Sequence, residues 1–131
     1  MIVQKFYIDK YDWQVVVLYE VSYYNKDYVI NILRQICNKE SIINQAKANL
    51  NLDKYNTGFT YSDLDEQCSF IVIGKASSNR ETVNTIVHEA NHLKSHIATK
   101  YNIDEKGEEV CYLIGGIVRT MFKVFSKIIC S

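Results

Sequence analysis

Apolar and polar residues repeat with two different periods along this chain, and the period predicts where strands and helices lie. Residues 1–8 and 12–21 are rich in Val, Ile, Phe, Tyr and Trp and flank a polar turn, which predicts a β-hairpin. Inside the second segment, residues 15–18 are all apolar. A continuous apolar run of this kind predicts a strand in the middle of the sheet, covered on both faces.

A helical period begins near Asn25. Apolar residues at three- and four-residue spacing predict one helix around residues 29–36 and another near residues 41–50. We expect both helices to cover one face of the sheet, and neither carries a recognisable chemical motif. A turn signal at residues 56–58 then marks the return to strand-forming sequence.

Two further strands are predicted at residues 59–61 and 68–73, joined by the polar segment 62–67. The second strand ends at Gly74, shortly before the longest predicted helix. This position gives two alternatives. Either the edge of this strand is open beside a cleft, where an extended peptide could pair with it, or the edge is covered.

The longest helix is predicted at residues 78–100, with Ser77 or Ser78 as its N-cap and an exit through a left-handed Asn102. Its expected core stripe consists of Val83, Ile86, Val87, Ala90, Leu93 and Ile97. A helical wheel places His88 and His92 opposite this stripe. The face that carries the histidines and the core face are therefore expected to be separate.

His88-Glu89-Ala90-Asn91-His92 is a complete H-E-x-x-H sequence within this helix. Histidines four residues apart lie one turn apart on the same side of a helix and can bind one metal ion, usually zinc. Glu89 is rotated by about 100° from His88, so it lies beside the metal as a non-ligand. There it can act as a general base toward a water that the metal activates. The alternative is a chance spacing on a solvated helix face.

A catalytic zinc site normally needs a third protein ligand. His96 is excluded, because eight helical residues separate it from His88 by about 12 Å; at the rim of the cleft it could instead bind substrate or be an ordinary exposed or hydrogen-bonded histidine. Glu108 and Glu109 are the main candidates, near the start of a last helix predicted from Asp104 or Glu105.

The last helix has an expected core stripe of Val110, Leu113, Ile114, Ile117, Met121 and Phe125. Its opposite side carries Glu108, Tyr112 and two small residues, Cys111 and Gly115, which we expect to allow close approach to the H-E-x-x-H helix. This wheel argument favours Glu108 over Glu109 as the third ligand, although acidic residues also favour any first helical turn. Tyr112 could donate to the oxyanion of a tetrahedral intermediate or simply pack.

These elements predict an α+β fold in one domain, residues 1–131, with a small twisted mixed sheet of about four strands. The active-site helix and the C-terminal ligand helix are expected to pack against that sheet. Lys plus Arg equals Asp plus Glu at 15 each, and no basic block alternates with aromatics, so neither nucleic acid nor an anionic membrane is an expected partner. No apolar run reaches the roughly 20 residues of a membrane helix.

The N-terminal sequence lacks the basic and apolar regions of a signal peptide, which predicts a cytoplasmic protein. The four cysteines, Cys37, Cys68, Cys111 and Cys130, form no C-x-x-C pair and are expected to be reduced, buried and apolar.

The H-E-x-x-H sequence with a downstream glutamate resembles the zincin metallopeptidases that bind zinc through two histidines and one glutamate. More closely, Glu108-Glu109-Val110-Cys111-Tyr112-Leu113 after H-E-A-x-H resembles small zincin-like proteins encoded by bacteriophages, in which E-x-x-A-Y-L follows the motif. Cys111 replaces the usual alanine. The resemblance covers roughly the C-terminal half, places the ligand at Glu108, and implies a minimal zincin-like fold in a bacterial or phage-infected cytoplasm or in a virion.

Two functions follow as hypotheses. The first is a zinc-dependent peptidase acting on a protein or peptide, with zinc held by His88, His92 and Glu108, and Glu89 as the base. The second is a non-catalytic zinc-binding structural or interaction protein, such as a virion component, in which metal binding stabilises the fold. Glu89 favours the first hypothesis, because stability alone does not require it.

Overall fold

In a computed structural model of the chain, which describes residues 1–37, 39–51 and 58–129, the N-terminal hairpin forms as predicted. Strands β1 (Ile2–Ile8) and β2 (Trp13–Val21) are antiparallel and are joined by a short 3-10 helix, η1 (Asp9–Tyr11). The apolar residues 15–18 of β2 are all buried, because β2 is an internal strand with helices on both faces. A second 3-10 helix, η2 (Tyr23–Asn25), follows β2.

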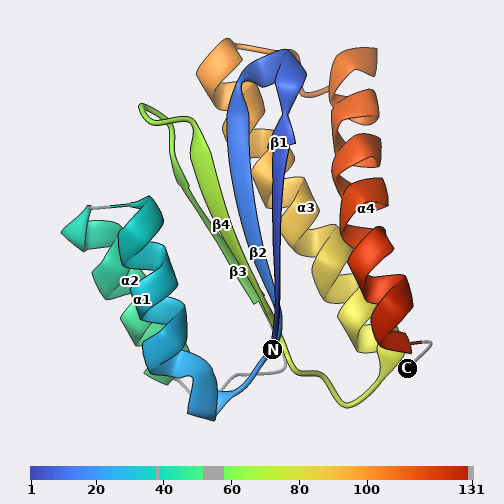
Figure 1. Cartoon of the computed structure of the whole chain (residues 1–131). Helices are drawn as coiled ribbons and strands as arrows, with labels where there is room; N and C mark the ends of the chain where they lie inside the picture. The colour runs from blue at the N-terminus through green and yellow to red at the C-terminus, as the bar shows by residue number, and fades with distance from the viewer. Residues whose placement is uncertain (38, 52–57, 130–131) are drawn as a thin grey trace.

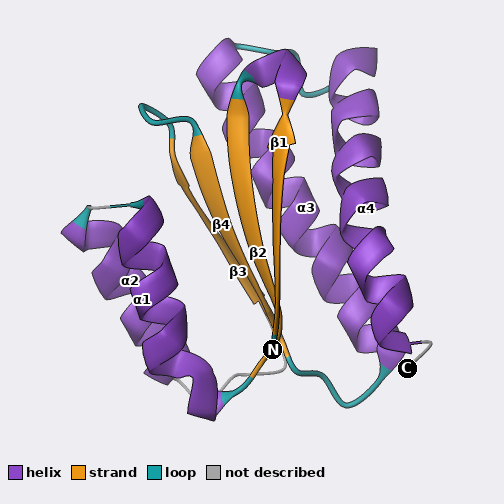
Figure 2. Ribbon diagram, in the orientation of Figure 1, coloured by secondary structure: helices purple, strands orange, loops and turns teal. Residues whose placement is uncertain are grey.

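The sheet has four strands in the order β1-β2-β4-β3 (Figure 2). Strand β4 (Cys68–Gly74) is parallel to β2 and antiparallel to β3 (Gly58–Asp63). Because β4 is paired on both sides, the structure agrees with the second of the two alternatives for this strand, a covered edge. The edge strand beside the H-E-x-x-H helix is β3. Of the turn signal at residues 56–58, positions 56 and 57 lie outside the described residues.

Helices α1 (Lys26–Ile36) and α2 (Glu40–Asn51) cover one face of the sheet, as predicted (Figure 1). Their apolar stripes meet the strand side chains that point to this face. This cluster contains Val16, Leu18, Val29, Leu33, Ile43, Ala46, Leu50, Phe70 and Val72. The two helices thereby close the sheet on the side away from the H-E-x-x-H motif.

Helices α3 (Asn79–Tyr101) and α4 (Glu108–Ile129) cover the other face as an antiparallel pair (Figure 1). Ser78 caps α3 by accepting a hydrogen bond from the Glu81 N–H, and Asn102 ends it in the left-handed conformation (φ 53°), both as predicted. Helix α4 begins at Glu108, a few residues later than predicted, because residues 104–107 form a turn.

The α3 and α4 stripes form the second core cluster with the sheet. Val87 is an exception to the predicted stripe, since it is 43% exposed. In the described part of the chain, no helix has the combination of length and apolar character that crossing a membrane requires. The fold is therefore α+β with a mixed four-stranded sheet, as expected.

The described cysteines are all free thiols. Cys37 and Cys68 are buried as predicted, and burial raises the pKa of the Cys68 thiol to about 11. Cys111 is exposed on α4, which contradicts its predicted burial. Cys130 lies outside the described residues.

Candidate metal and catalytic site

His88 and His92 converge at the surface of α3. Their Nε2 atoms are 3.1 Å apart and their ring centroids 4.7 Å apart. The four-residue spacing brings them together, because one helical turn separates the two side chains. Both histidines are exposed, and the side chain of His88 is 66% exposed. The pair is therefore accessible from solvent and open to a ligand.

Glu89 is buried beside this pair. It is 3% exposed, and its Oε2 lies 4.0 Å from His88 Nε2. Its Oε1 accepts a hydrogen bond from Thr60 Oγ1 on β3 at 2.8 Å. The wheel prediction is confirmed in that Glu89 lies next to the histidines but faces a different direction. Its carboxylate lies between α3 and the edge strand.

Burial raises the pKa of the Glu89 carboxyl above its ordinary value. The hydrogen bond from Thr60, and then His92 and His88, oppose this rise without cancelling it. A carboxylate with a raised pKa is a stronger base than an exposed glutamate.

Gly58 allows β3 to approach α3 closely at this point. A Cβ at position 58 would lie 2.5 Å from the Val72 carbonyl oxygen, 2.9 Å from Thr85 Cγ2 and 3.0 Å from Glu89 Cγ. A larger residue would therefore force a shift between β3 and the main chain of β4, or of these α3 side chains. The hydrogen bond from Thr60 to Glu89 depends on this close packing.

His96 lies one turn beyond His92, with its ring centroid 6.5 Å from that of His92. Its Nδ1 is hydrogen-bonded to Ser62 Oγ on β3 at 2.6 Å. Burial, and secondarily His92, lower the pKa of His96. The structure therefore places His96 at the rim of the site, half-buried and engaged with the edge strand, as the sequence suggested for a residue that is not a metal ligand.

The structure does not bring Glu108 to His88 and His92. Helix α4 begins beside the end of α3, and His92 is nine residues, or about 13 Å, before that end. The turn before α4 and the H-E-x-x-H residues also contact different sides of α3. Lys94 forms an ion pair with Glu105 of that turn at 2.8 Å, and Lys94 is rotated around the helix by about 140° from Glu89.

The predicted close approach of α3 to the small residues of α4 does not occur. The face with Cys111 and Gly115 is exposed, and nothing lies within 4 Å of a Cβ built at Gly115. Helix α4 instead packs through its apolar stripe, which is broad enough to contact both the sheet and α3. Glu109 also lies away from the histidines, and it forms an exposed ion pair with Lys10 at 3.2 Å.

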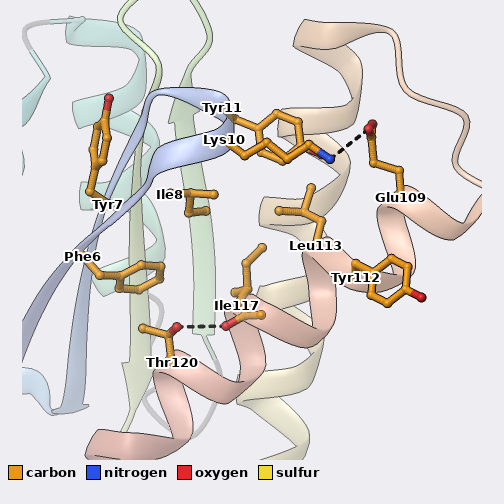
Figure 3. Close-up of a pocket in the computed structure, with 11 residues that line it drawn as sticks. Phe6, Tyr7, Ile8, Lys10, Tyr11, Glu109, Tyr112, Leu113, Ile117 and Thr120 are labelled. Carbon is orange, nitrogen blue, oxygen red and sulfur yellow. Dashed lines mark hydrogen bonds and ion pairs between the residues drawn. The ribbon is translucent and has the colours of Figure 1, made fainter.

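Tyr112 is 77% exposed at a separate pocket of about 290 Å³ between β1 and α4 (Figure 3). This pocket is lined mainly by Phe6, Ile8, Tyr11, Leu113, Gly116 and Ile117. Neither His88 nor His92 contributes to it. The structure thus separates Tyr112 from Glu89 and the histidine pair, since the tyrosine lines a pocket formed by β1 and α4.

The outer edge of β3 runs beside Glu89 and His96. The Gln14 N–H bonds to the Gln67 carbonyl, so alternate residues of β4 direct their main-chain groups to β2 and to β3. By the same alternation, Phe59, Tyr61 and Asp63 bond to β4, whereas the main-chain groups of residues 58, 60 and 62 point outward. No further strand pairs with this edge in the described ranges.

A zinc ion fits the donor set of the histidine pair. Two nitrogens bound at about 2.05 Å with a tetrahedral angle would be roughly 3.3 Å apart, close to the observed 3.1 Å. A dication there would also offset the charge of buried Glu89, whose carboxylate accepts a hydrogen bond from Thr60 alone among the described residues. Across those residues, no three His, Cys, Asp or Glu side chains form a group that could hold a metal.

Gly58, Thr60 and Ser62 are the site residues that sequence reasoning missed. A signal was present, because these small and polar residues alternate with Phe59 and Tyr61 along one strand. Such alternation assigns them to one face of β3, but the sequence does not reveal which helix covers that face.

The chain matches no protein-family model, no curated protein and no solved structure.

Proposed function

We propose that this chain is a zinc-dependent peptidase in which His88 and His92 hold the metal and Glu89 is the general base. The observation that carries the proposal is a buried carboxylate, 3% exposed, whose Oε2 lies 4.0 Å from His88 Nε2, beside an imidazole pair whose Nε2 atoms converge at 3.1 Å. Stability alone gives no reason to bury an acid there, since burial of a carboxylate is costly.

When bound, zinc supplies Lewis acidity that polarises a carbonyl and makes water a better nucleophile. Glu89 would accept a proton from the attacking water and would return it to the leaving amine. Thr60 holds one carboxylate oxygen at 2.8 Å, which leaves Oε2 on the histidine side to receive the proton. The described residues thus supply an oriented base and two of the three protein ligands that a catalytic zinc site normally has.

The outward main-chain groups of residues 58, 60 and 62 support a peptide as the substrate class. An extended peptide can pair with such an edge through its own backbone, whatever its sequence. Thr60 belongs to this edge and also contacts Glu89. A peptide paired with β3 would therefore pass beside the base and the histidine pair.

The test is hydrolysis of a peptide library by the wild type and by Glu89→Gln, with the zinc content of both proteins measured. We expect the wild type to cleave peptides, and the variant to retain zinc while losing at least about a hundredfold in kcat/KM. Equal turnover in the variant would remove Glu89 from its assigned role. Zinc that raises the melting temperature without any hydrolysis would support the alternative, a non-catalytic zinc-binding structural or interaction protein.

A further inference from the structure

A chain of hydrogen bonds runs from the core of the sheet to His96. Trp13 Nε1 donates to Ser69 Oγ at 2.8 Å, Ser69 Oγ is 2.6 Å from Ser62 Oγ, and Ser62 Oγ is 2.6 Å from His96 Nδ1. The chain crosses β2, β4 and β3 before it reaches α3. One imidazole at the rim of the site is thereby fixed by three strands.

In this series of hydrogen bonds, only one direction of donation gives every buried donor an acceptor. The Trp13 indole can only donate, so Ser69 Oγ accepts from it. Ser69 is 1% exposed, so its own hydrogen needs a buried acceptor, and Ser62 Oγ is in place at 2.6 Å. The Ser62 hydroxyl then donates to His96 Nδ1. The reverse direction would leave the Ser69 hydrogen buried without an acceptor, which is unfavourable.

His96 is therefore a neutral imidazole with its proton on Nε2. Burial, which lowers its pKa, acts in the same direction. No hydrogen bond to Nε2 is present within the described part of the chain, so this N–H is an unused donor one turn beyond His92. The donor lies at the rim of the site that includes Glu89.

The register of β3 sets the distance between this donor and the base. Thr60 contacts Glu89, and Ser62, two residues further along the strand, contacts His96. Two residues of a strand span about 7 Å. Directly opposed residues on paired strands direct their side chains to the same face of a sheet, so a substrate residue opposite Ser62 would place its side chain near His96.

We propose that His96 determines specificity: its Nε2–H binds an acceptor oxygen in the substrate side chain two residues from the cleaved bond. Ser62, Ser69 and Trp13 are positioning residues that fix its tautomer. The inference rests on the proposed peptidase function. A neutral N–H donor favours Asn, Gln, Ser or Thr, whose oxygens accept, over Leu, which offers no acceptor, and over Lys, which offers only donors.

The tautomer is tested without any need for activity. Long-range ¹H–¹⁵N NMR of the metal-free wild type should show His96 with Nδ1 unprotonated and Nε2 protonated. In Ser62→Ala, which removes the last hydroxyl of the chain, we expect both tautomers to be populated. A wild-type His96 protonated on Nδ1 would overturn the inference, whatever the protein hydrolyses.

The specificity is tested with zinc-loaded protein and peptide libraries varied at each position around the cleaved bond. At the position two residues away, we expect kcat/KM to be about three- to tenfold higher for Asn, Gln, Ser and Thr than for Leu or Lys, as one neutral hydrogen bond would give. His96→Phe should abolish this preference, and His96→Gln, which keeps an N–H donor, should restore part of it. Preferences at other positions should not change.

The outcomes separate the inference from the function on which it rests. Cleavage by the wild type without this preference, or with the same preference in His96→Phe, overturns the inference and leaves the peptidase function in place. A zinc-loaded wild type that cleaves no peptide overturns the peptidase function and the specificity assignment together. The NMR result then still reports whether the hydrogen-bonded chain fixes the imidazole.

Discussion

Thr60 Oγ1 donates to Glu89 Oε1 at 2.8 Å, and this contact ties the edge strand to the carboxylate of the H-E-x-x-H helix. Thr60 Oγ1 also lies 3.3 Å from the Glu89 main-chain oxygen. Because the hydrogen bond favours the ionised carboxylate, it lowers the pKa of Glu89 and limits the rise that burial causes. The edge strand therefore adjusts the base as well as forming one side of the site.

Replacing this threonine should shift the pH dependence of catalysis. Thr60→Val removes the donor, so the pKa of Glu89 should rise further. Because the base must be ionised, the acid limb of kcat/KM against pH should move to higher pH. Thr60→Ser keeps a hydroxyl and should leave that limb near its wild-type position. An acid limb that is the same in Thr60→Val and the wild type would contradict this account.

Gly58 and Gly115 offer a matched pair for stability. Gly58→Ala should destabilise the protein by about 1–3 kcal/mol, because its Cβ would meet a main-chain oxygen at 2.5 Å. Gly115→Ala enters open space within α4 and should stabilise the protein by about 0.5–1 kcal/mol through helix propensity. Urea unfolding of both variants measures the difference, and a neutral Gly58→Ala would refute close packing at the edge strand.

Asp63 at the end of β3 should make stability depend on acid pH. Burial alone would raise its pKa, but Lys39 and the main-chain N–H groups of Glu66 and Asp65 together hold that pKa below its usual value. Its Oδ1 accepts from Lys39 Nζ at 3.0 Å. A folded-state pKa below the unfolded value gives stability that is present above the unfolded pKa and lost as pH falls through the folded pKa.

Asp63→Asn should therefore lower the free energy of unfolding by about 1–2 kcal/mol at pH 7. The difference in the free energy of unfolding between the variant and the wild type should narrow below about pH 4, where the wild-type carboxylate becomes protonated. Asp65→Asn is the control, because the Asp65 side chain is 85% exposed and its ion pair is worth little. Denaturant titrations at several pH values measure this difference. The same difference between Asp63→Asn and the wild type at every pH would contradict the interpretation.

Glu108→Gln should leave zinc affinity unchanged. The sequence favoured Glu108 as the third ligand, but in the structure it is exposed at the same end of the fold as Tyr101, the last residue of α3, which is about 13 Å along that helix from His92. Competition with a chromogenic chelator measures the affinity. A loss of tenfold or more in this variant would show that α4 moves to bring the carboxylate to the metal.

The elements of the fold were predictable because each has a clear period, although the start of α4 differs by a few residues from its prediction. The apolar residues 15–18 mark an internal strand, and Ser78 and Asn102 mark the two ends of α3. The distance of Glu108 from the histidines was not predictable from a helical wheel. A wheel gives the angle of a residue around its own helix, but it gives neither the axial offset between two helices nor the partner of each face.

The same limit explains why the contribution of β3 was missed. The motif identifies His88, Glu89 and His92 through a spacing within one helix, so it needs no tertiary information. Thr60 and Ser62 reach Glu89 and His96 only because β3 is the edge strand over α3, which depends on the strand order of the sheet. Local sequence does not determine that order.

The central claim, that His88 and His92 form a metal site, is tested most directly by measuring metal stoichiometry. Elemental analysis of protein purified without chelator, and again after zinc loading and desalting, should give about one zinc per chain for the wild type. His88→Ala and His92→Ala should each lose most of it, since a single imidazole binds zinc weakly. A wild type that carries no stoichiometric metal and cannot be loaded with zinc would contradict the account.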